Sequence, residues 1–534
     1  MNNSYPASAS CRQFGHPALV SLRPLDGVPG KRVSAFIAGG ACVFLALALC
    51  ALFARYQHWF MIPVTLCGVL VTSDALSLLK TKRRIYEPAV LMSVYGIYFF
   101  FVAPLLHVYY GYWLIYAQDA PDDWRPWLAR MACFNFIGLV IYKWVRDQYM
   151  RRSGGRQSVR QWVPRYDVLA AEFLIALLVS AACQVWVYAK FGGINSFIST
   201  FKGQTSENFA GLGFIFSVAD TFPIFAFIAL CIFVLSRRRR VSMGTIAGLL
   251  GIVLVLSVIF GGLRGSRTLI VGNVLWAAGI VHFTLRPLTK RVVLFGLCAI
   301  VVFMYAYGFY KDYGLQGMDY LFSDSAGRAR AGVRTGRTTE GLLLGDLGRS
   351  GIQAYTLYRL GKSDSDYQYA WGTTYLGAAS LFIPKQFRPT NLVTTNRAGM
   401  QMAYGQDSYI EGSQGATYVY GLAGEAMLNF TPWAIPLSFG ALGVLVGYVQ
   451  KWFGQLPRGD LRWYIAPPIA ILTLSALTGS SDNLLYAVCT TLLLPWLILL
   501  LGAKQLAPVR PPFSQGQHIA TVMPARRTGL LDGE

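Results

Sequence analysis

Gly244-Thr-Ile-Ala-Gly-Leu-Leu-Gly-Ile-Val-Leu-Val-Leu-Ser-Val-Ile-Phe260 is an uncharged apolar run that ends in the turn Gly261-Gly-Leu-Arg264-Gly-Ser-Arg267. A run of this length is typical of a helix that crosses the hydrocarbon core of a bilayer. Spans of a β-barrel would instead be about ten residues long and would alternate in polarity. The sequence therefore predicts an all-α, polytopic transmembrane helix bundle of about twelve spans. The apolar blocks lie near residues 34–54, 59–79, 88–110, 127–144, 168–189, 213–235, 244–260, 269–285, 292–310, 432–450, 464–480 and 484–503.

The composition supports a membrane protein and argues against several other classes. Of 534 residues, 54% are hydrophobic and 13% are charged, about half the charged fraction of a soluble domain. The net charge of +22 fits basic cytoplasmic loops, so no nucleic-acid partner is expected. The sequence lacks a P-loop, a Rossmann glycine signature and an HExxH motif, and its histidines are scattered. Neither a metal nor a cofactor is expected.

Two tails and one long polar segment interrupt the apolar blocks. Residues 1–33 and 504–534 are predicted to be disordered cytoplasmic tails. Residues 34–310 hold spans one to nine, and residues 432–503 hold spans ten to twelve. Between them, residues 311–431 form a polar segment rich in glycine and tyrosine. Loops of this length are uncommon without structure of their own and are usually functional, so short helices are expected there.

Basic residues are divided unevenly between alternate loops, which predicts the orientation of the chain. If the amino terminus is cytoplasmic, the loops on that side hold 21 lysines and arginines: Lys80, Lys82, Arg83, Arg84, the seven between Lys143 and Arg165, Arg237 to Arg240, Arg286, Lys290, Arg291, Lys451, Arg458 and Arg462. The opposite loops and helix ends hold six: Arg55, Arg125, Lys190, Lys202, Arg264 and Arg267. Both termini are therefore predicted to be cytoplasmic and the long segment 311–431 periplasmic.

Two arginine clusters lie on the predicted periplasmic side, and the charge rule disfavours the first of them, which is in a short loop. Arg264 and Arg267 are three residues apart beside glycines, and the planar guanidinium suits phosphate oxygens. A helix end anchored to lipid headgroups is the alternative. The second cluster, four arginines within ten residues, reads as an anion cradle or as a solvated face that touches anionic lipid. Its members are Arg328, Arg330, Arg334 and Arg337.

Two carboxylates are candidates for general base. Glu425 lies in Gly-Leu-Ala-Gly-Glu-Ala-Met-Leu-Asn-Phe430, about two turns before the next span; the alternative is a structural acid with an arginine partner. Asp220 lies inside the sixth span, where ionisable residues are functional candidates by default, and Pro223 predicts a kink beside it. A structural pair between Asp220 and a loop arginine is equally compatible. Asp74, nearer the cytoplasmic side, is interpreted as structural.

The order of these features resembles that of the Wzy-type oligosaccharide repeat-unit (O-antigen) polymerases. An Arg-Gly-x-Arg turn precedes a span, and a long periplasmic loop follows two spans later. A Gly-Glu-Ala-x-x-Asn-Phe stretch then leads into the glycine-rich helix Phe439-Gly-Ala-Leu-Gly-Val-Leu-Val-Gly447. The resemblance covers residues 34–503 in architecture, but its residue-level motifs are confined to 261–268 and 418–447.

The resemblance implies a metal-independent glycosyltransferase in the bacterial inner membrane. Its substrates would be undecaprenyl-diphosphate-linked glycans, and membrane lipids and a chain-length regulator protein would be further partners. Arg264 and Arg267 would bind the diphosphate, the four arginines of the second cluster would assist, and Glu425 or Asp220 would act as base. The long loop lacks the histidine typical of the related O-antigen ligases, which favours a polymerase.

Two alternatives stay open at this point. A flippase or other transporter of lipid-linked sugars often has about twelve spans, arranged as two related halves. A structural scaffold would leave the arginines of the outer face without a shared site. The sequence does not identify the sugars, the linkage or the chain length.

The orientation is testable with reporter fusions. Because of the charge asymmetry, fusions after Gly265 and within residues 330–400 should report a periplasmic location. Fusions after Arg240 and Arg291 should report a cytoplasmic one. A cytoplasmic signal from within 330–400 would overturn the assignment of that segment to the periplasm.

Overall fold

The computed structural model describes most of the chain between residues 30 and 506. The described ranges are 30–79, 85–114, 117–151, 160–202, 212–237, 241–313, 340–363, 365–380, 392–408, 418–457 and 459–506, with isolated positions at 319, 322–324, 327, 338, 383, 387 and 389. The predicted tails, apart from 30–33 and 504–506, lie outside these residues.

Each of the twelve predicted apolar blocks is helical, so the helical fold class is confirmed. Among the described residues, ten helical stretches are long and apolar enough to cross a membrane, and the first and eleventh blocks form shorter apolar helices. The protein is a multi-pass membrane protein. In chain order the elements of the blocks are α1 (Gly30–Leu52), α2 (Met61–Leu79), α3 (Pro88–Ile97) with α4 (Ala103–Tyr110), α5 (Arg125–Arg151), α6 (Tyr166–Lys190), α8 (Gly213–Asp220) with α9 (Phe222–Arg237), α10 (Met243–Phe260), α11 (Arg267–Ile280), α12 (Lys290–Tyr313), α19 (Ala434–Gln455), α20 (Ala466–Thr478), and α21 (Ser481–Val488) with α22 (Leu494–Leu501).

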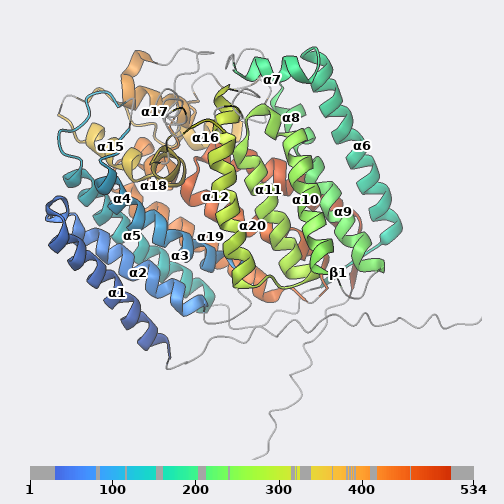
Figure 1. Ribbon diagram of the computed structural model, residues 1–534, viewed down its shortest axis with the longest axis horizontal. Coiled ribbons are helices and arrows are strands. Elements are labelled where there is room, and N and C mark those ends of the chain that lie inside the picture. Colours follow the sequence, from blue (N-terminus) through green and yellow to red (C-terminus); the bar gives the residue numbers. More distant parts are fainter. Residues whose placement is uncertain are drawn as a thin grey trace, which may run out of the picture.

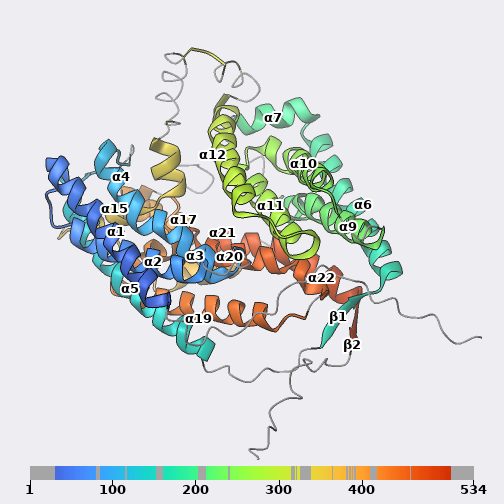
Figure 2. The same cartoon turned by 60° about the horizontal axis from the view of Figure 1, so that its bottom comes forward.

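The helices form two groups with separate hydrophobic cores (Figures 1 and 2). The first bundle contains α1 to α5 together with α19, which packs along α5 although most of the chain separates them. Gly443 permits this approach, because a Cβ there would lie 2.7 Å from the carbonyl oxygen of Tyr142. The second bundle contains α6 and α8 to α12. Helix α20 contacts α3 and α19 on one side and α11 on the other, so α20 to α22 join the two bundles.

One end of the assembly carries the short helices of the chain, and we call it the loop end (Figure 1). It includes the turn between α10 and α11 and the described elements of the long polar segment. One of these, α15, is buried along most of its length and packs against α4, α5 and α18 rather than lying on a surface. Helix α7 (Ile194–Lys202), which follows α6, also lies at this end. The elements of the long polar segment are the π-helix η7 (Gly341–Leu347), α15 (Ser350–Leu360), α16 (Thr373–Ala379), α17 (Thr395–Tyr404) and α18 (Gly421–Asn429).

At the opposite end, a small antiparallel sheet departs from the all-α prediction. Strand β1 (Gln161–Pro164) pairs with β2 (Ala503–Leu506), so the residues just after position 503 are a strand and not the start of a disordered tail. The pairing is anchored by Asp460, whose carboxylate accepts a hydrogen bond from the Trp162 backbone at 3.1 Å. The composition of 504–506 gives no strand signal, because the partner strand lies more than 300 residues away.

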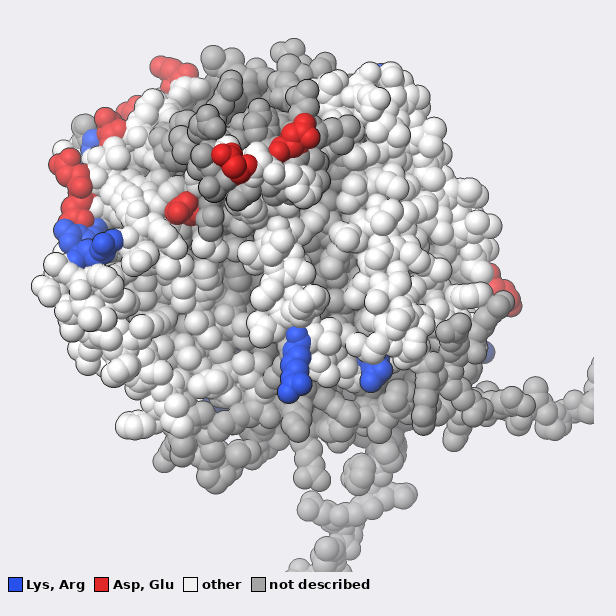
Figure 3. Space-filling view, viewed as in Figure 1, with Lys and Arg blue, Asp and Glu red and all other residues white. Residues whose placement is uncertain are grey.

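The surface has the polarity expected of a membrane-spanning body. In Figure 3 the centre of the visible face is uncharged. Acidic side chains lie mostly above it toward the loop end, and basic side chains lie both below it and, at the left, beside the acidic ones. Large apolar side chains are exposed on the outer helices, for example Phe36, Phe214, Phe295 and Leu437, each at least three-quarters exposed. Contact with lipid accounts for such exposure, which a soluble protein avoids.

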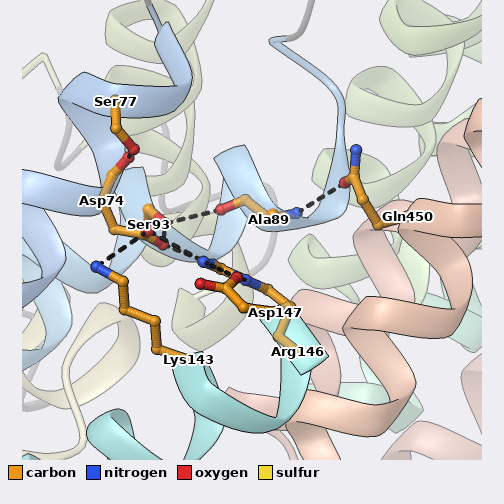
Figure 4. Close-up of polar contacts among 8 residues, drawn as sticks. All are labelled: Asp74, Ser77, Ala89, Ser93, Lys143, Arg146, Asp147 and Gln450. Atoms are coloured by element: carbon orange, nitrogen blue, oxygen red, sulfur yellow. Dashed lines mark hydrogen bonds and ion pairs between the residues drawn. The ribbon is translucent and has the colours of Figure 1, made fainter. Parts of the chain in front are cut away.

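A buried ion pair fixes the far ends of α2 and α5, as the interpretation of Asp74 as structural predicts (Figure 4). Arg146 grips Asp74 with two nitrogens, at 2.6 and 3.0 Å, and both side chains are buried. Ser93 donates to the same carboxylate at 2.7 Å, and Lys143 lies 3.5 Å from it. The half-exposed carboxylate of Asp147 also accepts from Arg146, at 2.9 Å. Every charge in the group has a partner, which a buried ion requires.

Removing one partner of this pair should destabilise the fold. Asp74→Asn leaves Arg146 buried with only half-exposed Asp147 to balance it, so unfolding should become easier by about 3 kcal/mol. Asp147→Asn is the matched control and should cost less than about 1 kcal/mol, because half-exposed pairs contribute little. Thermal denaturation of the purified proteins measures both. Equal losses would show that burial of the Asp74 pair does not matter.

Candidate functional site

The site begins at the glycine-rich turn between α10 and α11. Residues 262–264 form one turn of 3₁₀ helix, and Gly265 closes it with φ of 82°, a conformation that favours glycine. A Cβ at Gly261 would lie 2.7 Å from Leu269 and 3.4 Å from Asp220, so the glycine allows the turn to sit directly on that carboxylate. Tyr310 holds the turn by donating to the Leu263 carbonyl at 3.0 Å. The turn therefore presents its arginines from a fixed backbone.

Asp220 reaches this turn because its helix is broken. Helix α8 ends at Asp220 and α9 begins at Phe222, which confirms the kink predicted from Pro223. The proline has no N–H to give the carbonyl of Ala219, and Ser180 of α6 donates to that carbonyl at 3.1 Å instead. The broken helix thus keeps its backbone satisfied inside the membrane-spanning region, which has no water to do so.

Arg264 and Asp220 form a buried ion pair. Nη2 of Arg264 donates to Oδ2 of Asp220, and the two side chains are 14% and 1% exposed. The guanidinium also lies 4.7 Å from the ring centre of Phe216, and the hydroxyl of Tyr486 lies 3.5 Å from Asp220 Oδ2. Burial opposes the charge, but the carboxylate holds the pKa of Arg264 above its ordinary value, so the arginine stays cationic.

Arg267 extends the site across the seam between the bundles. Its Nη2 donates to Asp346 of η7 at 2.5 Å, which joins the second bundle to the long polar segment. Arg349, three residues further on, donates through Nη1 to the carbonyls of Gly345, at 2.7 Å, and of Asp346, at 3.0 Å. Its Nε donates to the carbonyl of Thr478 at the end of α20, at 3.3 Å. Burial, with a contribution from the like charge of Arg267, lowers the pKa of Arg349.

Two guanidinium groups from one turn, Arg264 and Arg267, and a third from the long polar segment, Arg349, therefore lie at the loop end. Arg264 and Arg267 are the pair predicted from the sequence, and Arg349 and Asp346 are additions. Each arginine has five donors, so contact through one or two nitrogens leaves a guanidinium able to take further oxygen ligands. The predicted cluster of Arg328, Arg330, Arg334 and Arg337 lies outside the described residues, and its role stays a prediction.

Glu425 lies in a different, closed setting. It is 3% exposed, and Oε1 accepts hydrogen bonds from the hydroxyls of Thr374 at 2.9 Å, Thr395 at 2.7 Å and Ser481 at 2.5 Å. Oε2 accepts from the backbone N–H of Ser481 at 2.7 Å. Its described partners are hydroxyls and an amide, where the structural alternative predicts an arginine. In this arrangement Glu425 connects α16, α17 and α21 to α18, and its Oε1 already accepts three hydrogen bonds. Its role as a base stays a prediction.

Asp220 differs from Glu425 because one of its carboxylate oxygens accepts no hydrogen bond from the described residues. Within the described residues, its Oδ1 is buried and has no hydrogen-bond partner. A buried acceptor without a donor is costly and calls for a ligand or a reacting group. Of the two predicted carboxylates, Asp220 is the one that shares a site with the arginines.

Part of the site was not predictable from local sequence. Arg349 lies in a helix start with no neighbouring motif, and Asp346 carries no signal beyond its charge. Both become candidates only through their contact with Arg267 and the end of α20. Within the described ranges, no three His, Cys, Asp or Glu side chains gather closely enough to hold a metal ion. The expectation that the protein works without a metal stays a prediction.

Comparison of the chain with protein-family models, with curated proteins and with solved structures finds no match. The resemblance to repeat-unit polymerases therefore depends on the motifs and on the arrangement described above.

The contact between Arg267 and Asp346 should be a bridge that stabilises the seam. Arg267→Asp places two carboxylates together and should lower the free energy of unfolding by roughly 1–3 kcal/mol. The charge-reversed double variant, Arg267→Asp with Asp346→Arg, should recover part of that loss, because the pair is restored. Thermal denaturation of the three proteins measures this. Losses that simply add in the double variant would mean that the two residues do not interact.

Proposed function

We propose that the protein is a glycosyltransferase that polymerises undecaprenyl-diphosphate-linked oligosaccharide repeat units at the periplasmic face of the bacterial inner membrane. The observation that carries this proposal is the gathering of Arg264, Arg267 and Arg349 at the loop end, where the two bundles meet. The short loops on this side are otherwise poor in basic residues, so Arg264 and Arg267 need a function. Arg349, from the long polar segment, adds a third guanidinium beside them.

The charge balance of the site fits an anionic lipid substrate. Two carboxylates, Asp220 and Asp346, accept hydrogen bonds from Arg264 and Arg267. A diphosphate carries more charge than either carboxylate and offers oxygens in the geometry that a guanidinium binds best. It can therefore replace them at the arginines. The polyprenyl chain would lie against the apolar surface of the bundles while its diphosphate stays at the loop end.

The chemistry needs no energy source beyond the substrate. A hydroxyl of the acceptor glycan attacks the anomeric carbon of the donor, the bond from that carbon to the diphosphate oxygen breaks, and undecaprenyl diphosphate leaves. Negative charge grows on the leaving oxygen, where prearranged arginines in a poorly hydrated site stabilise it. Charge-assisted hydrogen bonds contribute about 1.5–3 kcal/mol each, so two account for a large rate enhancement.

Asp220 is the better candidate to take the proton of the attacking hydroxyl. When the diphosphate takes over Arg264, Asp220 loses its cationic partner and becomes a stronger proton acceptor. Its unpartnered Oδ1 supplies the position for the hydroxyl. This couples substrate binding to activation of the base. Glu425, held by four donors, is then a residue that positions the elements around the site.

The main alternative, a flippase or other transporter, has less support. Transporters built from repeats place two consecutive halves of the chain side by side. Here α19, from the last third of the chain, completes the first bundle with α5, so the bundles are not consecutive halves. A scaffold is also disfavoured, because the arginines share one site. An O-antigen ligase remains distinguishable by its product.

The proposal predicts activity of the purified protein with a defined substrate. In nanodiscs it should extend lipid-diphosphate-linked repeat units into a ladder on a gel, with a chelator present and no nucleotide added.

Arg264→Lys keeps the charge but loses the planar fork, so the rate should fall about tenfold or more. Arg264→Ala should be weaker still, and Asp220→Asn should lower turnover more than substrate binding.

The matched control is Arg286→Ala, an exposed arginine in the loop after α11 at the opposite end, which should keep full activity. Wild-type ladders from Arg264→Ala at normal protein level would remove the arginine from the mechanism. Loss of activity with a chelator and its recovery with Mg²⁺ would exclude the metal-independent reaction.

In cells, deletion of the gene should leave a single repeat unit on the lipid A core. Unmodified core alone would point to a ligase or a flippase.

A further inference from the structure

A row of aromatic side chains lies on the long polar segment, away from the arginines. Tyr369, Trp371, Phe430 and Tyr375 follow one another with ring centres 6.2, 6.4 and 6.5 Å apart, and we call them the aromatic ledge. Trp371 is 71% exposed, and Phe430 and Tyr375 are each more than one-third exposed. The ledge therefore offers ring faces and edges to a ligand rather than to the core.

The backbone of the ledge is strained. Trp371 has φ of 47° and Thr431, next to Phe430, has φ of 137°, in a region that non-glycine residues rarely adopt. Gly372 follows with φ of 86°. Exposed aromatic residues have no packing reason to adopt such a conformation. Strain of this kind persists where the surrounding structure fixes it, and it is concentrated at functional sites.

A buried hydrogen-bond network fixes the strained segment from beneath. The backbone N–H of Trp371 donates to the carbonyl of Asn429 at 2.9 Å, and that of Gly372 donates to its side-chain oxygen at 2.9 Å. The Asn429 side chain donates in turn to Thr374 at 2.7 Å, and Thr374 donates to Glu425. The closed setting of Glu425 thus serves to hold the ledge in one geometry.

We propose that the aromatic ledge is a carbohydrate-binding subsite, on which a sugar ring of the glycan substrate stacks. This rests on the proposed function for the identity of the glycan. A pyranose has an apolar face of C–H groups, which pack against the negative face of an aromatic ring. The ledge is uncharged, as befits a neutral glycan, and α16, which carries Tyr375, packs against α21, which carries Tyr486 of the arginine site. The ledge and the arginine site therefore lie on neighbouring helices.

The alternative is that these rings belong to an aromatic belt at the membrane surface. Belt residues act through their amphipathic character and need no fixed orientation. Trp433, at the start of α19, is such a residue: it is 74% exposed, and its backbone is regular. The locked and strained geometry of Trp371 distinguishes the ledge from it.

The test compares variants of the full chain in nanodiscs by saturation-transfer NMR. The probe is the oligosaccharide released by mild acid from the surface polysaccharide of the producing cell. Trp371→Asn removes the ring and keeps the backbone, because asparagine tolerates positive φ. It should bind the probe about tenfold more weakly, the loss of one stacking contact. Trp371→Tyr should retain most of the binding, and Trp433→Asn is the matched control and should bind like the wild type.

Unchanged binding by a well-folded Trp371→Asn protein would overturn the proposal. Equal losses in Trp371→Asn and Trp433→Asn would also overturn it and would assign the ledge to the aromatic belt. The outcome is separable from that of the proposed function, because the probe carries no diphosphate and binding is measured without turnover. Binding that depends on Trp371 in a protein without polymerase activity would leave the ledge a glycan site and remove only the reaction.

Discussion

A hydrocarbon environment has no water to solvate a backbone amide, and this constraint governs where the chain is allowed to be irregular. Most helices therefore run unbroken, and the interruption at Thr221 is tolerated because Ser180 takes up the freed carbonyl. Two further spans contain π-helical segments, Tyr98–Val102 and Cys489–Leu493, in which the chain stays helical on both sides. The turn at residues 261–266, the π-helix η7 and the strained ledge are all at the loop end, where chemistry with water-soluble glycan is possible.

Burial away from water also requires that charged side chains have partners, and the protein contains two different arrangements of buried ion pairs. At one end, Arg146 and Asp74 satisfy each other with a bidentate contact and a serine, which leaves nothing for a ligand. At the other, Arg264 and Asp220 share one contact, and an oxygen of Asp220 remains without a partner in the described structure. The first arrangement is complete and stabilises the fold; the second is incomplete and is suited to binding.

Much of the fold follows from local sequence, while the site follows only partly. Apolar blocks predict the helices because length and polarity act locally, and Pro223 predicts the break beside Asp220. Arg264 and Arg267 stand out because the charge rule disfavours their location. Arg349, Asp346 and the hydroxyl partners of Glu425 are brought together by contacts between distant segments, and a single sequence carries no record of such contacts. The pairing of β2 with β1 was not predictable either, because the two strands are far apart in the sequence.

The position of α20 to α22 has a consequence for how the protein is made. Membrane helices are inserted in order of synthesis, so the first four spans and the whole second bundle are made before the chain reaches α19 at residue 434. Until then α5 lacks α19, and the arginines lack the carbonyl of Thr478 and the hydroxyl of Tyr486. A chain that ends near residue 430 would have both bundles inserted but would leave uncovered the faces of α3, α5 and α11 that α19 and α20 contact. Completion of the arginine site is therefore one of the last steps of assembly.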